Sequence, residues 1–344
     1  MELALFGEHF HLLLDRRERL RYFLTMLRNF LIFSLLSLFS LRAEMLIPMD
    51  EVQTDHLRAY GVAYRALQLG IDVEWLLNYR GGSFMMPEDP EVEKFAQIQG
   101  VYYVLISPSE VASIYATIEE NNMNHILLEK APKVAVYIPP YAEPWDDAVA
   151  LALEYANIPY DRIYDEDILS GKLRFYDWLH LHHEDFTGQY GKFYLAYHNA
   201  DWYQREVKVN EEIARKLGYD KVWKLKHAVA REIRRYVEGG GFLFAMCSAP
   251  ITLDIALASE RVDIVGVVYD GDPPEADAEA KLDFSKTFAF TNFNLVMDPL
   301  VYEHSNVDVT REASLRGPDT YFTLFNFSAK YDPCLLYTSP SPRD

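Results

Sequence analysis

One run of residues, 238–250, constrains the fold of this chain more than any other. In order it contains Glu238, three glycines, the apolar segment Phe242–Met246, and then Cys247, Ser248, Ala249 and Pro250. Glycines that adopt positive φ end helices, and a short apolar run is typical of a strand buried in a parallel sheet. Proline favours the first turn of a helix. The run therefore predicts a helix end, a strand, a sharp turn and a new helix over 251–259.

Cys247 stands at the carboxyl end of this predicted strand. Ala245 and Ala249 lie two residues to either side of it. A strained strand-to-helix turn that presents a nucleophile needs small residues at these two positions, because larger side chains would clash. Cys247 is therefore a candidate nucleophile, with backbone N–H groups of the turn as its oxyanion hole. The structural alternative is a buried cysteine that only packs.

The composition excludes several classes of function. Half of the 344 residues are apolar and 14% are aromatic, so a large core is expected. The formal net charge of −19 argues against a nucleic-acid partner, because a phosphate backbone is bound mainly by clusters of Lys and Arg. The two cysteines, Cys247 and Cys334, do not form a disulfide framework. We predict a small-molecule substrate or ligand, and no cofactor; the sequence leaves the oligomeric state open.

From Glu44 onward, apolar strands alternate with helices. Strands are expected over 45–49, 71–77, 101–106, 133–138, 160–164, 242–246 and 262–268, and helices over 50–69, 91–99, 108–121, 144–156, 206–217 and 222–237. This alternation predicts βαβ units and a doubly wound, mostly parallel sheet in a single α/β domain over 44–333. Two aromatic segments, 284–295 and 321–327, are expected to form an antiparallel extension or a lid.

A second cluster of polar residues follows another predicted strand. Alternation places His180 and His182 on one face of that strand, with Leu179 and Leu181 on the other. His183, Glu184 and Asp185 then fall at its carboxyl end, where ligands bind in open α/β sheets. These side chains are suited to acid–base catalysis, and the alternative is a solvated turn held by their mutual hydrogen bonds. Their spacing matches no specific metal motif, so no metal site is predicted.

The two ends of the chain carry different signals. Residues 26–43 have the features of a secretory signal: Arg28, the apolar run 30–41 and a cleavage-like Ala43. We therefore expect export to the periplasm or the exterior, no stable membrane span in the mature chain, and a mis-assigned upstream start over 1–25. Residues 334–344 closely resemble the translation of a sequencing-library adapter, which predicts that the natural carboxyl end is truncated here.

The turn at Cys247 resembles the nucleophile elbow of the class I glutamine amidotransferase-like fold, with alanine where that superfamily has glycine. Longer motifs resemble an exported bacterial family usually called asparagine synthetase B. These motifs are Leu46–Asp50, Trp75–Phe84, Trp178–Gln189 and Phe244–Ser248. The resemblance covers 44–333 and implies a flavodoxin-like sheet with a cysteine nucleophile. Two signatures of asparagine synthesis are absent, namely an amino-terminal cysteine and a Ser-Gly-Gly-x-Asp-Ser loop.

Two hypotheses follow, and the sequence does not decide between them. The first is a glutamine amidotransferase-like amide hydrolase with Cys247, His183 and Glu184 as its catalytic residues. In amidotransferase-like folds the histidine base lies near the carboxyl end, and His304 is the only histidine that follows Cys247. The second is a non-catalytic exported binding module for a carbohydrate or another small ligand. Arg80, Asp185 and Ser248 are the candidate ligand-binding residues.

Overall fold

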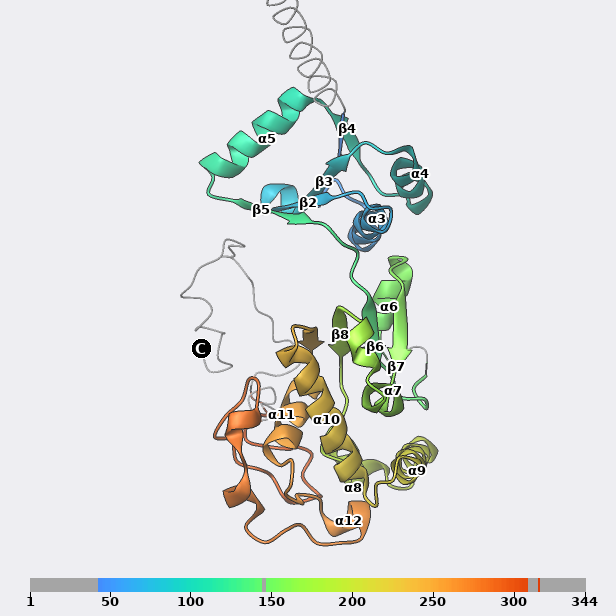
Figure 1. The fold of residues 1–344 in the computed structure, drawn as a ribbon, viewed down its shortest axis with the longest axis vertical. Helices are drawn as coiled ribbons and strands as arrows, with labels where there is room; N and C mark the ends of the chain where they lie inside the picture. Colours follow the sequence, from blue (N-terminus) through green and yellow to red (C-terminus); the bar gives the residue numbers. More distant parts are fainter. Residues whose placement is uncertain (1–42, 144–146, 309–314, 316–344) are drawn as a thin grey trace, which may run out of the picture. The chain divides into compact units, whose positions relative to one another are not determined.

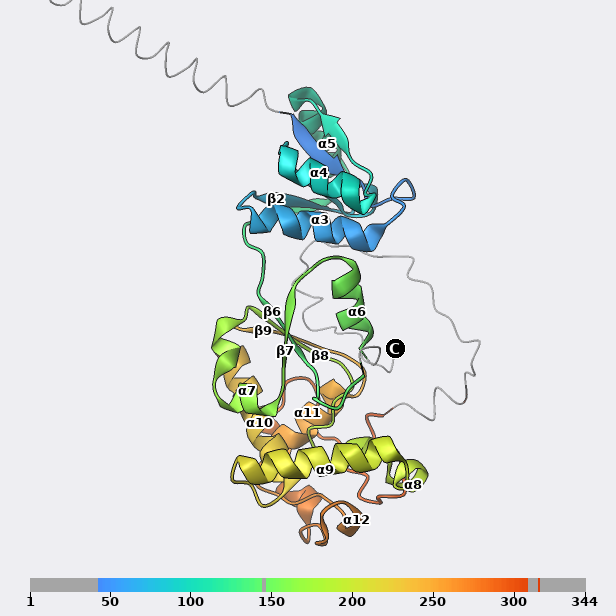
Figure 2. The same ribbon diagram turned by 90° about the vertical axis from the view of Figure 1, so that its right-hand side faces the viewer.

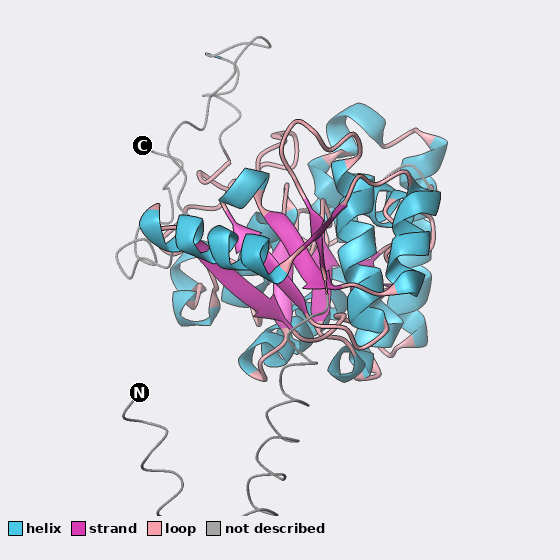
Figure 3. Cartoon of the chain, turned by 90° about the horizontal axis from the view of Figure 1, so that it is seen from above, coloured by secondary structure: helices cyan, strands magenta, loops and turns pink. Residues whose placement is uncertain are grey.

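The computed structural model describes residues 43–143, 147–308 and 315. The predicted upstream start, almost all of the signal segment, the aromatic segment 321–327 and the tail 334–344 lie outside these residues. The chain divides into two compact units between Lys130 and Ala131 (Figure 1). The sequence pattern had indicated a single domain over 44–333. Each unit has its own sheet and its own helices. Figure 3 colours the helices, strands and loops of the chain separately.

The first unit contains an antiparallel sheet. Its strands are β1 (Glu44–Ile47), β2 (Val73–Leu77), β3 (Ser83–Pro87), β4 (Val104–Ile106) and β5 (Asn124–Leu128), in the order β4-β1-β3-β2-β5. The expected parallel pairing does not occur here, because β2 turns straight back into β3. That strand then pairs with both β1 and β2 and separates them. The β-α-β-β-α-β order is that of a split βαβ unit, extended by one helix and one strand.

Three longer helices complete the first unit. They are α3 (His56–Gln68), α4 (Pro90–Gln99) and α5 (Pro108–Glu120). The helix α5 begins with a capping box, since Ser107 and Glu110 exchange backbone and side-chain hydrogen bonds. The helix α5 packs on one face of the sheet through Ile114 and Ile118. On the opposite face, Tyr60 of α3 contacts the ring of Phe84 with centroids 5.3 Å apart.

The second unit contains a parallel sheet with its core mainly on one side. Its strands are β6 (Val134–Tyr137), β7 (Tyr160–Ile163), β8 (Trp178–Leu181) and β9 (Phe242–Ala245), in the order β7-β6-β8-β9. Its helices are α6 (Ala148–Tyr155), α7 (Asp165–Leu169), α8 (Tyr194–Tyr197), α9 (Asp201–Lys216), α10 (Val222–Glu238), α11 (Ala249–Ala258) and α12 (Val267–Asp270). Figure 2 shows these strands side by side.

Helices cover both faces of this parallel sheet. Leu179 and Leu181 of β8 pack into the large core that includes α10 and α11, while Val134 and Val136 of β6 pack against α6. This confirms the predicted alternation along β8. The strand β9 is one of the two edge strands of the described sheet, and its Phe242 is 60% exposed and its Phe244 47% exposed.

Two strand predictions beyond β9 are wrong. Residues 262–268 pair with no described strand; they run into α12, and Val262, Ile264 and Val265 are buried individually in the core. The segment 284–295 is largely irregular, with one isolated bridge at Leu295. The buried Asp254 carboxylate accepts the backbone N–H groups of residues 288, 289 and 290. A side chain of α11 thus accepts the backbone N–H groups that would otherwise donate to a neighbouring strand.

The turn between β2 and β3 provides a test of the first unit. A methyl group on Gly81 (φ +81°) would lie 2.3 Å from the Met49 carbonyl oxygen, whereas one on Gly100 (φ +71°) would meet nothing within 4 Å. Gly100→Ala therefore carries only the left-handed backbone cost, about 1–2 kcal/mol. Gly81→Ala adds overpacking of about 1–3 kcal/mol. Urea unfolding should show this larger loss, and equal losses would contradict the close approach.

Candidate functional site

The elbow around Cys247 forms as the sequence predicts. The helix α10 ends at Glu238, and Gly240 follows with a φ of +95°. After β9, the backbone of Cys247 has a φ of +56°, a region that non-glycine residues rarely occupy. The next helix begins at Ala249, which is fully buried, with Pro250 in its first turn. Cys247 itself is a free, exposed thiol, so the alternative of a buried packing cysteine is not observed.

The order of the strands brings this elbow against the end of β8. The two strands pair in parallel, with Leu181 opposite Ala245. Beyond the paired residues, the Ser248 hydroxyl donates to the His183 carbonyl at 3.0 Å, and the Thr252 hydroxyl donates to the Glu184 carbonyl at 2.6 Å. The predicted histidine cluster and the predicted nucleophile turn therefore lie at the same edge of the sheet.

The backbone of the elbow leaves two donors available. Among the residues that the structure describes, the amide groups of Cys247 and Ser248 have no acceptor. The next amide, that of Ala249, donates to Met246 at 3.2 Å. Free N–H groups beside a nucleophile are the donors that an oxyanion requires. The geometry of the turn is thus compatible with the oxyanion hole expected from the sequence.

His183 is connected to two further polar side chains. The Nδ1 atom of His183 lies 3.2 Å from Nδ1 of His182, and that atom of His182 lies 3.8 Å from the carboxylate of Asp147. Asp147 also caps α6 by accepting two backbone N–H groups. The His183 side chain is exposed, whereas Glu184 is buried and accepts the His182 backbone N–H at 2.7 Å. His183 is therefore the more accessible of the two proposed acid–base groups.

Asp185 has a structural part in organising the loop that follows β8. Its carboxylate accepts the backbone N–H groups of Thr187, Gln189 and Gly191 and the hydroxyl of Thr187. The Nε2 atom of His304 lies 3.8 Å away, and both side chains are buried. Burial alone would raise the pKa of Asp185, but His304 and these hydrogen bonds hold that pKa well below its usual range. Asp185 is thus committed to the protein's own donors.

Two other predicted site residues are also engaged in local structure. Arg80 lies in the first unit, where its Nε donates to Oδ2 of Asp50 at 2.6 Å and its Nη2 donates to Oδ1 of Asp50 at 3.3 Å. This ion pair raises the pKa of Arg80 and lowers that of Asp50. Arg80 is thus engaged by Asp50 within the first unit. The Ser248 hydroxyl joins the elbow to β8, as described above.

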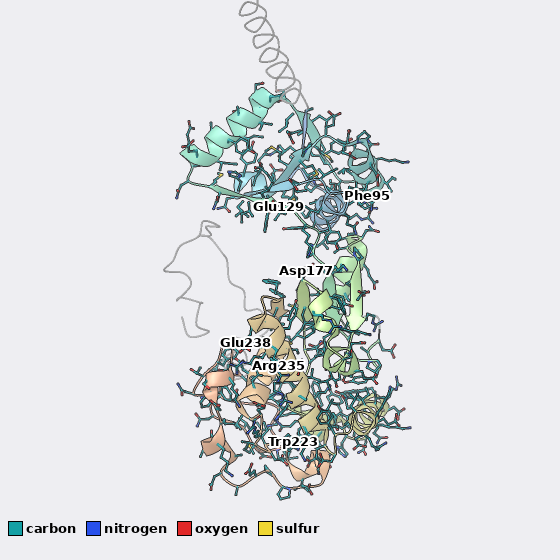
Figure 4. The ribbon with its side chains drawn as sticks, in the orientation of Figure 1. Phe95, Glu129, Asp177, Trp223, Arg235 and Glu238 are labelled. Carbon is teal, nitrogen blue, oxygen red and sulfur yellow. The ribbon has the colours of Figure 1, made fainter. Side chains whose placement is uncertain are left out.

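A cavity of about 350 Å³ opens at the carboxyl ends of β6 and β8. Strand order changes direction between these two strands, which is where open α/β sheets bind ligands. The lining side chains include Tyr137, Tyr141, Tyr164, His183, Glu184, Asp185, Tyr190, Trp202, Glu206, Asn210 and Lys226. In Figure 4, Trp223 and Glu238 label opposite ends of α10, and the cavity lies towards the Trp223 end. Its volume is at the low end of the range for small-molecule sites.

A buried ion pair forms one wall of this cavity. The Lys226 ammonium donates to Asp165 at 2.8 Å, to the Tyr164 hydroxyl at 2.8 Å and to the Tyr137 hydroxyl at 3.1 Å. The Tyr137 hydroxyl donates to the other oxygen of Asp165 at 2.5 Å. Hydrogen bonds then continue from Tyr164 to Asn210, Tyr141 and Glu206. All three ammonium protons of Lys226 thus have acceptors.

Two carboxyl groups at the cavity have strongly raised pKa values. Burial raises the pKa of Glu184 to about 8, although backbone hydrogen bonds oppose this shift. Burial likewise raises the pKa of Glu206 to about 7, against the hydrogen bond from Tyr141. Groups that titrate near neutral pH are the ones able to exchange protons with a ligand. Glu184 thus has a property suited to the acid–base role predicted for it.

Sequence reasoning missed Lys226, Glu206 and Asp165, although signals for two of them were present. Lys226 lies on the apolar stripe of α10, four residues after Val222 and seven before Ile233. Asp165 lies two residues after the end of β7, a strand of the parallel sheet. No local pattern distinguishes Glu206 from the other acidic residues of α9.

These features define an α/β protein with a candidate small-molecule site at the carboxyl edge of a parallel sheet. No protein-family model, curated protein or solved structure matches the chain. Within residues 43–143 and 147–308, no His, Cys, Asp and Glu side chains are grouped closely enough to hold a metal ion. Across the same ranges, none of the helices combines the length and the apolar character needed to cross a membrane.

The raised pKa of Glu184 predicts a pH dependence of stability. Its folded-state pKa of about 8 exceeds the ordinary value of 4.5, so the folded protein binds the proton more tightly than the unfolded chain. Its contribution is therefore complete below pH 4.5 and is lost as the pH rises to about 8. Glu184→Gln should flatten the fall in stability by up to about 1.4 kcal/mol per pH unit. Urea unfolding from pH 5 to 8 measures this slope, which exposed Glu212→Gln should leave unchanged.

The buried ion pair predicts a second, matched comparison. Lys226→Met leaves the Asp165 carboxylate buried without its cation, which should cost about 3–5 kcal/mol. Adding Asp165→Asn should recover part of this loss. Lys224→Met, two residues away, removes an exposed pair with Asp220 and should change stability little. Denaturant unfolding of the unmodified chain and these three variants measures the losses. Equal losses of stability at 224 and 226 would contradict a buried ion pair at Lys226.

Proposed function

We propose that this protein is a cysteine-dependent amide hydrolase of the glutamine amidotransferase-like class. The observation that carries the proposal is the exposed Cys247 thiol on a positive-φ turn beside the end of β8. Cys247 is the nucleophile in this proposal, and His183 is the base. His182 and Asp147 orient His183, and Glu184 supplies a second proton-exchanging group at the same edge.

The strand order supports the proposed fold. The order β7-β6-β8-β9 corresponds to the first four positions of the flavodoxin-like order 2-1-3-4-5. Helices on both faces are consistent with a doubly wound sheet in the second unit. In such a sheet, a strand-to-helix turn at a carboxyl end presents its side chain to the ligand-binding edge. The proposal extends the sequence resemblance on this basis.

The proposed reaction has two balanced steps. His183 takes the proton of the Cys247 thiol, and the thiolate sulfur bonds to the amide carbonyl carbon. The amide N–H groups of Cys247 and Ser248 stabilise the resulting oxyanion. The C–N bond breaks, and the leaving amine takes the proton from His183. Water, deprotonated by His183, then cleaves the thioester to a carboxylic acid and restores the thiol.

The proposal predicts that His183 controls the reactivity of Cys247. In a Cys334→Ser background, iodoacetamide should label Cys247 about tenfold faster at pH 7 than it does after His183→Ala, because a neighbouring imidazole promotes thiolate formation. His125→Ala, a change at an exposed histidine of the first unit, is the matched control and should leave the rate unchanged. Mass spectrometry of the labelled peptide measures both rates.

Three outcomes decide this test. Labelling of Cys247 only after denaturation would contradict a presented nucleophile. A rate indifferent to His183 would remove His183 as the base and leave the buried His304 beside Asp185 as the described alternative. Ammonia release from L-glutamine that is lost in Cys247→Ser and kept in Cys334→Ser would support the hydrolase directly.

A second candidate function is a non-catalytic binding module for a carbohydrate or another small ligand. The aromatic lining of the cavity favours it, because tyrosine and tryptophan faces suit such ligands. Export to the periplasm or the exterior belongs to both proposals and depends on the signal pattern over 26–43. Amino-terminal sequencing of secreted material should give a start near Glu44.

A further inference from the structure

We infer that the cavity between β6, β8, α9 and α10 binds a ligand through a primary ammonium group held by Glu184 and Glu206. Binding of an ammonium group in this cavity does not require Cys247 to be a nucleophile, because the turn at Cys247 contributes no residue to the cavity lining. It therefore applies whether the ligand is a substrate or is only bound.

The charges around the cavity leave two carboxyl groups without a cation. Lys226 is neutralised by Asp165 and fully hydrogen-bonded. Asp185 is saturated by backbone N–H groups and the Thr187 hydroxyl. Within the described ranges, no Lys or Arg nitrogen lies within 4.0 Å of the carboxylate of Glu184 or Glu206. Glu143 of the lining lies 3.8 Å from Arg205, so Glu184 and Glu206 are the lining carboxyl groups that have no Lys or Arg within ion-pair distance among the described residues.

Both carboxyl groups can accept further hydrogen bonds from a ligand. Glu184 accepts the His182 backbone N–H through Oε2, and Glu206 accepts the Tyr141 hydroxyl through Oε1. Glu184 also accepts its own backbone N–H, whereas Glu206 keeps a second oxygen without a described partner. An ammonium group carries three donors and a positive charge, so it can donate to Glu206 and favour the charged form of both carboxyl groups.

Aromatic rings supply the second element of recognition. Tyr137, Tyr141, Tyr164, Tyr190 and Trp202 line the same cavity. Tyr141 and Tyr164 stand edge to face with centroids 6.4 Å apart, and hydrogen bonds fix both hydroxyl groups. The faces of such rings attract cations. Preformed aromatic walls with two carboxyl groups therefore favour an organic cation over a neutral sugar.

The experiment uses n-propylammonium chloride as the probe and n-propanol as its neutral isostere. Titration of the full chain at constant ionic strength, followed by isothermal titration calorimetry, should show saturable binding of the amine only. Glu206→Gln and Glu184→Gln should each raise the Kd about tenfold or more, because each removes a charge-assisted hydrogen bond. Glu212→Gln on the same helix is the matched control and should not change the Kd.

Several results would overturn the inference. Propanol or methyl β-glucoside binding at least as tightly as the amine would assign the cavity to neutral ligands. Calcium binding that is lost in both Gln variants, with no amine binding, would assign it to a metal. Amine binding that is unaffected by both substitutions would place the probe elsewhere. Cys247→Ser should bind the probe like the unmodified chain, so this test is independent of the thiol labelling.

Discussion

The candidate site depends on the position of β8 between β6 and β9. Parallel hydrogen bonding on both sides of β8 puts the carboxyl ends of three strands at one edge. One of these strands ends at the Cys247 turn, another at the histidine cluster, and the third at the tyrosines of the cavity wall. The segments involved are more than 100 residues apart in sequence, from Tyr137 to Cys247. Without this pairing, none of the polar groups would share a site.

Burial of charge is the second organising principle of the second unit. Asp185 and Asp165 are both buried carboxylates, but their surroundings differ. Backbone N–H groups and Thr187 surround Asp185, while Lys226 and Tyr137 surround Asp165. Glu184 has fewer donors, and its pKa rises accordingly. The same kind of side chain therefore either organises a loop or remains available for proton exchange, depending on how many donors reach it.

The sequence predicted the second unit better than the first. Its strand–helix order, the strand-to-helix turn at Cys247 and the two-faced pattern of β8 follow from short apolar runs, glycines and alternation. In the first unit, the strand β3 directly follows β2 through a turn with Gly81 and Gly82, and its pairing made the sheet antiparallel. The segments 262–268 and 284–295 have the composition of strands. Neither segment pairs as a strand: the core buries Val262, Ile264 and Val265, and Asp254 accepts the backbone N–H groups of residues 288–290.

The sequence alone determined the local geometry at Cys247 and the position of His183, Glu184 and Asp185 at a strand end, since both depend on neighbours within a few residues. Only the tertiary structure decided which of these groups are available. Asp185 is occupied by its own loop, and Arg80 is paired with Asp50 in the other unit. Lys226 and Glu206 line the cavity from separate helices, and the buried Asp165 pairs with Lys226. Such contacts are set by long-range packing and by the free-energy cost of burying unpaired charges, which no local pattern records.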